Sequence, residues 1–170
     1  DWTCDWRGPD VFLSVNSYLM PPTIIRYDVE TGLSSTHMAV EAPVNVDRYV
    51  TRQVWYPSRD GTMVSMFLVH ERDLVLDGAN PTILYGYGGF NISQTPEFAR
   101  NRYLWFEHGG VYAFPNLRGG GEYGEEWHRS GARLNKQNTF DDFIAAAEWL
   151  IDSGYTQPSR LAVWGGSNGG

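Results

Sequence analysis

Cysteine is almost absent from this 170-residue chain: Cys4 is the only one, so no disulfide can form within it. A lone cysteine suits a reducing compartment and favours a cytoplasmic location. Basic residues are also scarce, because 13 Lys and Arg stand against 20 Asp and Glu and leave a formal net charge of -7. This balance offers no basic surface for nucleic acid, which we do not expect as a partner. No apolar run approaches the ~20 residues that span a bilayer, so we expect no membrane partner.

The chain is instead rich in hydrophobic residues, at 42%, which predicts a globular fold. Strand patterns at 11–15 and 23–29, with a Pro21-Pro22 break between them, predict short strands in the first 40 or so residues and indicate the last piece of a larger antiparallel β domain. Beyond residue 44 the pattern predicts a hairpin with its turn at 58–61, and then alternating buried strands and helices. Strands are predicted at 47–56, 63–69, 81–87, 111–114 and 161–164, and helices at 98–108 and from 139. The alternation predicts an α/β fold with a partly parallel sheet.

The clearest helix is predicted to begin at Thr139. Its hydroxyl is placed to cap the first turn, with Asp142 in the capping-box position three residues on, and Gly154 ends the helix. One face is apolar at helical spacing, which predicts that it is buried. This face comprises Phe140, Phe143, Ile144, Ala147, Leu150 and Ile151.

A strand pattern at 161–164 runs directly into G-x-S-x-G, with Ser167 at its centre. This is the spacing of a nucleophile elbow, in which a serine occupies a sharp strand-to-helix turn and projects above the sheet. Gly165 and Gly169 would let two backbone segments pass close together. The alternative is a glycine-rich loop after a strand, without a catalytic role.

A nucleophilic serine needs a base, an acid that orients the base, and donors for the oxyanion. In α/β hydrolases the serine comes first along the chain, then the acid, then the histidine. The four histidines all precede Ser167 and do not fit that order: His37, His70, His108 and His128. The reverse order suits a double β-barrel protease, but the alternation of strands and helices argues against that fold. We therefore expect the base and the acid to lie beyond residue 170.

A second glycine-rich stretch, 85–90, follows a predicted buried strand. In α/β hydrolases the loop after such a strand supplies an oxyanion donor. The phenol hydroxyl of Tyr87 and the backbone N–H of Asn168 are the two candidates, and we expect Tyr87 to face Ser167. The alternative is that Tyr85 and Tyr87 are aromatic residues of the core or its rim.

A third stretch, 118–124, matches G-x-G-x-x-G, with Asp141 and Asp142 about 20 residues further on. This resembles a dinucleotide-binding fingerprint, but the acidic residues begin a helix where the fingerprint needs the end of a strand. The stretch more simply predicts a tight loop at the carboxyl edge of the sheet. We expect an ion pair between Arg118 and Glu122 to hold that loop.

Four stretches together resemble the prolyl oligopeptidase family of serine peptidases: 84–93 (LYGYGGFNIS), 116–125 (NLRGGGEYGE), 136–143 (KQNTFDDF) and 165–170 (GGSNGG). The resemblance covers most of the chain from about residue 45. It implies an α/β-hydrolase fold, with a mostly parallel sheet and flanking helices, combined with a seven-bladed β-propeller. Residues 1–40 would then be the C-terminal remnant of the propeller, and residues 41–170 the N-terminal half of the catalytic domain.

The same resemblance implies that Ser167 is the nucleophile, that Tyr87 and the backbone of Asn168 form the oxyanion hole, and that Phe90 lines the proline pocket. The implied enzyme is a monomer that cleaves proline-containing oligopeptides on the carboxyl side of proline, through an acyl-enzyme and without metal or cofactor. The 170 residues alone are expected to be inactive, because they carry a nucleophile with no base. Two alternatives remain open: a related serine hydrolase or aminopeptidase, and a non-catalytic hydrolase-like binding module.

Overall fold

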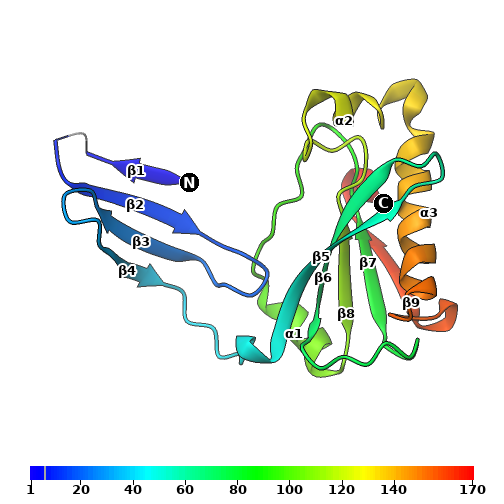
Figure 1. Ribbon diagram of the computed structural model, residues 1–170, viewed down its shortest axis with the longest axis horizontal. Coiled ribbons are helices and arrows are strands. Elements are labelled where there is room, and N and C mark those ends of the chain that lie inside the picture. The colour runs from blue at the N-terminus through cyan, green and yellow to red at the C-terminus, as the bar shows by residue number, and fades with distance from the viewer. Residues whose placement is uncertain (6) are drawn as a thin grey trace. The chain divides into compact units, whose positions relative to one another are not determined.

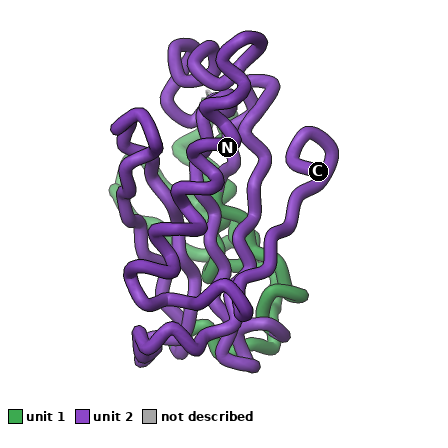
Figure 2. The backbone as a smooth tube through the Cα atoms, turned by 90° about the vertical axis from the view of Figure 1, so that its right-hand side faces the viewer, with its two compact units in different colours: residues 1–47, 96–103 green, residues 48–95, 104–170 purple. Residues whose placement is uncertain are grey.

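The computed structural model describes residues 1–5 and 7–170, which divide into two compact units, coloured separately in Figure 2. The first unit comprises residues 1–47 and 96–103, and the second comprises residues 48–95 and 104–170. Each unit contains its own sheet. The return of segment 96–103 to the first unit was not indicated by any sequence pattern.

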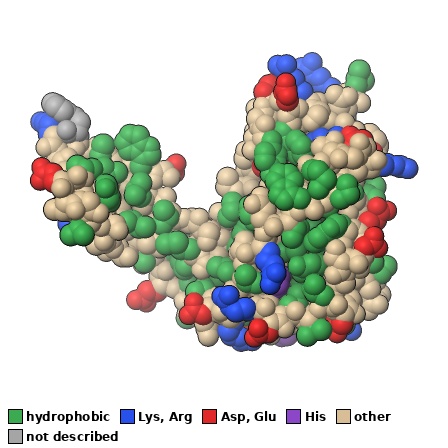
Figure 3. Space-filling model, viewed as in Figure 1, with side chains coloured by type: hydrophobic (Ala, Val, Ile, Leu, Met, Phe, Trp, Pro, Cys, Tyr) green, Lys and Arg blue, Asp and Glu red, His purple; other side chains and the backbone are tan. Residues whose placement is uncertain are grey.

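The first unit contains an antiparallel sheet of four strands in the order β1-β2-β3-β4 (Figure 1). The strands are β1 (Trp2–Cys4), β2 (Asp10–Val15), β3 (Thr23–Asp28) and β4 (Ser34–Ala39). Sequence patterns located β2 and β3 but missed β1 and β4, whose residues are all exposed and therefore lack an alternating apolar pattern. Hydrophobic side chains are visible on the surface of this unit (Figure 3). Trp2, Leu33 and Met38 are among its exposed large hydrophobic residues.

Within the first unit, segment 96–103 contacts the connection between β2 and β3. The backbone N–H of Phe98 donates to Asn16 Oδ1 at 3.1 Å, and the hydroxyl of buried Tyr103 donates to the Tyr18 carbonyl at 3.4 Å. Helix α1 (Arg100–Glu107) begins in this segment, within two residues of its predicted bounds, and ends in the second unit.

The second unit contains a five-stranded sheet in the order β5-β6-β8-β7-β9 (Figure 1). Its strands are β5 (Tyr49–Pro57), β6 (Met63–Glu71), β7 (Thr82–Gly86), β8 (Val111–Pro115) and β9 (Leu161–Gly165). The β5–β6 and β6–β8 pairs are antiparallel, whereas β7–β8 and β7–β9 are parallel. The sheet is therefore mixed, where the resemblance implied a mostly parallel one. The predicted hairpin turn is present, with Gly61 at φ 85°.

Helix α3 (Gln137–Asp152) covers one face of this sheet (Figure 1). Ala145, Ala146 and Leu150 pack with strand residues such as Met66 and Leu84 in the core. Two shorter helical segments precede it and a further two follow it: α2 (Glu125–Arg129), η2 (Arg133–Asn135), η3 (Pro158–Arg160) and η4 (Ser167–Gly169). A further one, η1 (Val46–Arg48), precedes β5. Within the described residues, no helix is both long enough and apolar enough to cross a membrane.

One prediction for α3 is wrong and a second is right only in part. The helix begins at Gln137, so Thr139 lies inside it, and its hydroxyl donates to the carbonyls of Arg118 at 2.8 Å and Gly131 at 3.0 Å instead of capping. On the predicted apolar face Leu150 is buried and Phe143 and Ala147 pack against the core, but Phe140 and Ile144 are each 52% exposed, while Thr139 and Asp142 are buried. Buried polar partners elsewhere in the chain outweigh the local capping signal and the apolar spacing.

Candidate active site

The three mutually parallel strands all end at the same edge of the sheet. β7 and β9 are paired in register from Thr82 with Leu161 to Gly86 with Gly165, and β8 lies on the other side of β7. The loops that follow these strands therefore gather at one place, although 75 or more residues separate the first from the last. Such carboxyl edges are where open α/β sheets hold ligands. The stretches at 85–90, 118–124 and 165–170 all contribute to this edge.

Ser167 lies on a sharp turn between β9 and the short segment η4. Its φ is 55°, in the left-handed region that non-glycine residues seldom adopt. A Cβ at Gly165 would overlap the carbonyl oxygen of Gly169, and one at Gly169 would overlap that of Gly86. This is the close backbone approach expected of the two glycines. Ser167 is exposed, and its hydroxyl makes no hydrogen bond to any described residue.

Asn168 connects this turn to the loop after β7. Its side-chain Nδ2 donates to the carbonyl oxygen of Tyr87 at 2.5 Å. Sequence reasoning considered only the backbone N–H of Asn168, so this side-chain contact is a new feature of the site. Tyr87 is half-buried and directly follows Gly86, the strand residue that pairs with Gly165. The structure therefore brings Ser167, Asn168 and Tyr87 onto adjacent segments of one edge.

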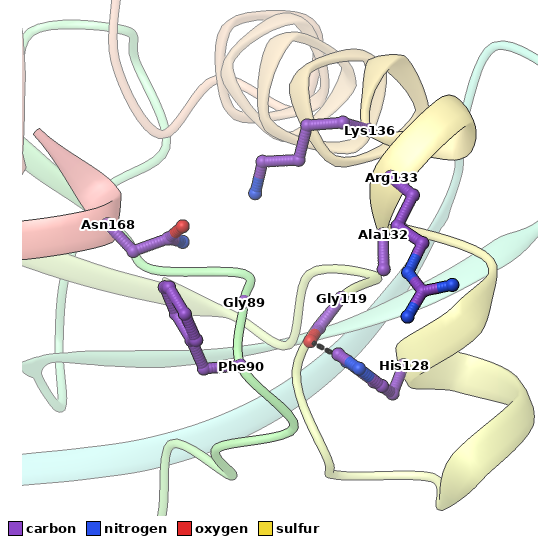
Figure 4. Close-up of a pocket in the computed structure, with 9 residues that line it drawn as sticks. Gly89, Phe90, Gly119, His128, Ala132, Arg133, Lys136 and Asn168 are labelled. Atoms are coloured by element: carbon purple, nitrogen blue, oxygen red, sulfur yellow. Dashed lines mark hydrogen bonds between the residues drawn. The ribbon is translucent and has the colours of Figure 1, made fainter.

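Phe90 lies further along the same loop, on a cavity of about 490 Å³ (Figure 4). Its φ is 54° and it is 73% exposed. Asn168 lines the cavity from the serine turn, His128 lines it from α2, and Arg133 and Lys136 line it from the connection between α2 and α3. Sequence patterns gave no reason to select these three basic residues, because they share no spacing motif and come together only through the fold.

His128 is held by the loop that follows β8. Its Nδ1 lies 2.7 Å from the carbonyl oxygen of Gly119 and 3.1 Å from the backbone nitrogen of Asn91. The shorter contact favours the tautomer with hydrogen on Nδ1, which donates to Gly119. His128 is thus a hydrogen-bonded structural residue, and no hydrogen bond joins it to Ser167.

The loop at 118–124 is anchored by a buried ion network. Arg118, whose side chain is 4% exposed, bonds Asp142 Oδ1 and Asp60 Oδ2, each at 2.6 Å. The predicted pair with Glu122 is therefore wrong. Burial alone would lower the pKa of Arg118, but its bonds to the two carboxylates outweigh burial and raise the pKa. In return, the hydrogen bond from Arg118 lowers the pKa of Asp60 to about 2.

Glu122 instead joins this loop to the one that carries Phe90. Its Oε1 accepts the backbone N–H of Gln94 at 2.9 Å, while its buried Oε2 has no hydrogen-bond partner among the described residues. Burial raises the pKa of this carboxyl group. Together, Arg118 and Glu122 fix the loops on which the candidate site is built.

These features define a class of protein. A mixed α/β sheet presents a serine on a strained strand-to-helix turn, at the carboxyl edge of parallel strands and beside a glycine-rich loop. α/β hydrolases place their nucleophile in this way.

Comparison with known proteins narrows the class to one family. The profile of the prolyl oligopeptidase family matches residues 96–170. A prolyl endopeptidase of Elizabethkingia meningoseptica is 48% identical over 161 residues, which are 95% of this chain and 23% of that protein. A prolyl oligopeptidase of Omphalotus olearius is 47% identical over 165 residues, or 95% of this chain and 22% of its own length. The chain belongs to the prolyl oligopeptidase family, and it spans about a quarter of the length of these relatives.

Solved structures agree with this assignment. A structure from an analysis of two prolyl endopeptidases superimposes with a TM-score of 0.93 at 48% identity, over 99% of this chain and 25% of that one. Prolyl oligopeptidase B from Galerina marginata, solved with a 25mer macrocyclization substrate, gives a TM-score of 0.93 at 40% identity, over 99% of this chain and 24% of that one.

Proposed function

We propose that this chain is part of a serine endopeptidase that cleaves proline-containing oligopeptides on the carboxyl side of proline. Ser167 attacks the carbonyl carbon of the proline residue, its proton passes to a base, and the amine of the next residue leaves. Water then releases the acyl group from Ser167. The phenol of Tyr87 and the backbone N–H of Asn168 stabilise the oxyanion, and Phe90 contributes an apolar wall for the proline ring.

One observation carries the proposal: Ser167 occupies the left-handed turn at the end of β9, and the side chain of Asn168 next to it donates to the backbone carbonyl of Tyr87. A nucleophile and two candidate oxyanion donors thus lie on neighbouring segments. The names of the relatives support the choice of peptide substrates over other esters and amides.

The base and the acid are proposed to come from outside these 170 residues. The Ser167 hydroxyl has no hydrogen bond to a described residue, and the histidine that lines the cavity, His128, is engaged by the Gly119 carbonyl. The 170 residues alone should therefore not hydrolyse a proline-linked chromogenic peptide. Turnover by the purified chain would contradict this part of the proposal.

The remaining assignments complete the proposed enzyme. Residues 1–40 are the C-terminal remnant of a β-propeller, and residues 41–170 are the first half of an α/β-hydrolase domain. We further propose a monomeric, cytoplasmic enzyme. The four-stranded antiparallel sheet supports the propeller assignment, and the single, exposed Cys4 supports the cytoplasmic location.

The test uses the full-length protein that contains this chain. A fluorophosphonate probe should label it, and Ser167→Ala should abolish both labelling and turnover of a blocked Gly-Pro chromogenic peptide. Ser159→Ala, a change at an exposed serine outside the site, is the matched control and should leave both labelling and turnover unchanged.

Labelling of the Ser167→Ala protein would refute the assignment of Ser167 as the nucleophile. An unlabelled wild type would favour a binding module, and faster turnover of peptides with a free N-terminus or of Arg substrates would favour the related hydrolases.

Tyr87→Phe tests the oxyanion donor. Removing one such donor should lower kcat by about 100-fold or more with little change in KM. Tyr85→Phe is the matched control, because Tyr85 lies two residues away and contacts Phe114 and Trp164 only through its ring. Equal effects of the two substitutions would contradict the assigned role of Tyr87.

A further inference from the structure

The cavity beside the serine turn is positively charged, although the chain as a whole carries a net charge of -7. His128, Arg133 and Lys136 form one side of it, and Phe90 and Asn168 form the other (Figure 4). None of the described residues that line it is acidic. The lining of the cavity therefore combines cationic donors with an apolar wall and contains no carboxylate.

Arg133 is the most unusual of these residues. Its φ is 54°, so the backbone at this position is held in a conformation that costs free energy for a side chain with a Cβ. Its guanidinium makes no hydrogen bond, ion pair or ring contact with the described residues. A strained backbone that presents an unpaired arginine to a cavity favours a role in binding a ligand over a role in stabilising the fold.

The segment around Arg133 is fixed before any ligand binds. Asn138 Nδ2 donates to the Ser130 carbonyl at 2.8 Å, and Asn135 Nδ2 donates to the Arg129 carbonyl at 3.2 Å. These bonds close the connection from α2 to α3 and hold the position of the arginine. Because the segment is already ordered, binding through it costs little conformational entropy.

Lys136 adds a second positive charge. Its Nζ donates to the Gly88 carbonyl at 2.7 Å and lies 5.7 Å from the centre of the Phe140 ring, and further N–H donors of the ammonium are left for a ligand. Burial lowers the pKa of Lys136, and no carboxylate offsets the effect. In Figure 4 the Lys136 ammonium and the Asn168 amide extend into the same space, and the guanidinium of Arg133 lies on the side of His128.

We propose that this cavity is a subsite for a carboxylate of the peptide substrate, bound by the guanidinium of Arg133 and attracted further by the positive charge of Lys136. The inference rests on the proposed peptidase function, because Asn168 links the cavity to Ser167 and so places it next to the scissile bond. A planar guanidinium and an ammonium suit a carboxylate, and Phe90 would cover the apolar part of the same residue. The carboxylate belongs either to an acidic side chain near the scissile proline or to the C-terminus of a short peptide.

Binding of matched peptides to the full-length Ser167→Ala protein distinguishes these sources without turnover. One arm compares Glu with Gln before the proline, a second compares Glu with Gln after it, and a third compares a free C-terminus with an amide. In the arm that varies the carboxylate bound by the cavity, the peptide with that carboxylate should bind about threefold to fivefold more tightly than its neutral partner at low salt. The difference in affinity should shrink as the salt concentration rises. Isothermal titration calorimetry provides the readout.

Variants at Arg133 assign the preference to the cavity. Arg133→Gln should remove most of the difference between acidic and neutral peptides, and Arg133→Lys should keep most of it. Both retain a Cβ at the same backbone position, so the backbone strain is unchanged. Arg160→Ala, at an exposed arginine that does not line the cavity, is the control and should keep the full preference.

The subsite is refuted if no arm favours the acidic peptide, or if the preference survives in Arg133→Gln. These outcomes are separate from failure of the proposed function. A wild type that is labelled at Ser167 and cleaves neutral peptides without an acidic preference retains the peptidase function and loses the subsite. A wild type that is not labelled loses the peptidase function, and the binding arms still decide whether the cavity holds carboxylates.

Discussion

Arg118 and Arg133 lie on loops of the same sheet edge, and their surroundings are opposite. Arg118 is buried and bonds two carboxylates, the Ser58 hydroxyl and the Thr62 hydroxyl. Arg133 is exposed, lies on a strained backbone and pairs with none of the described residues. The bonds of Arg118 hold together the β5–β6 hairpin, α3 and the loop after β8. The N–H donors of Arg133 remain available in a cavity.

The difference shows how to distinguish structural from functional charges in this protein. A buried charge with all its partners is costly to disturb, because each remaining partner would lose its compensation. An exposed charge without partners contributes little to folding, so its value must be sought in binding. Three substitutions test this distinction, beginning with the largest expected effect.

Arg118→Met removes the buried cation and leaves Asp142, which is 0% exposed, with an uncompensated charge. We expect a loss of about 3–5 kcal/mol in the free energy of unfolding of the full-length protein, measured by urea denaturation. Arg133→Met is the matched control and should change stability by less than about 0.5 kcal/mol. Equal losses would refute the distinction between the two arginines.

If Arg118→Met does not fold, a double variant maintains the test. Adding Asp142→Asn removes the buried negative charge, so the double variant should recover part of the lost stability. A double variant that is less stable than Arg118→Met would show that the charge on Asp142 is not the source of the loss.

Glu122 is an intermediate case, because one carboxylate oxygen is bonded and the other is buried without a partner. Burial raises the folded-state pKa of Glu122, so the protonated carboxyl group stabilises the fold at pH values below the unfolded-state pKa. This stabilisation is lost as the pH rises through the folded-state pKa. Glu122→Gln resembles the protonated form. Relative to wild type, the variant should therefore gain thermal stability as the pH is raised from 4 to 8. A difference between the two proteins that does not change with pH would contradict the burial of an ionised group.

Asp60 should give the smallest effect, because its side chain is 47% exposed. Its pKa is lowered to about 2, mainly by the hydrogen bond from Arg118. A lowered carboxylate pKa stabilises the fold above the unfolded-state value and loses that contribution as pH falls through the folded one. Asp60→Asn should thus show a shallower loss of stability than wild type between about pH 4 and about pH 2. Identical acid-unfolding curves would show that the Arg118–Asp60 bond contributes nothing measurable.

Local patterns predicted much of the second unit. The turn at 58–61, the strand that ends at Gly165 and the tight turn around Ser167 all depend on glycine or on alternation within a few residues, and the structure contains each of them. The first unit was predicted less well, because the exposed residues of β4 carry no alternating pattern.

Residues that contact distant segments were the ones predicted wrongly. Thr139 was expected to cap its own helix, but it bonds the carbonyl of Arg118, 21 residues away. Asp142 was expected to complete the cap, but it compensates the charge of Arg118 and accepts the hydroxyl of Ser58, 84 residues away. Arg118 was expected to pair with Glu122 within its own loop, yet it bonds Asp60 and Asp142, which lie on distant segments.

The sequence by itself determined the nature of the candidate nucleophile and the turn that presents Ser167. Glycine at positions 165 and 169 is needed for this turn, because a Cβ at either position would overlap a backbone carbonyl oxygen. Only the tertiary structure decided what surrounds that turn. Parallel pairing of β7 with β9 brings Tyr87 beside Asn168, and the fold of the α2–α3 connection brings Arg133 and Lys136 to the same cavity. Burial and hydrogen bonding act on distances in space, and the spacing of residues along a chain does not record those distances.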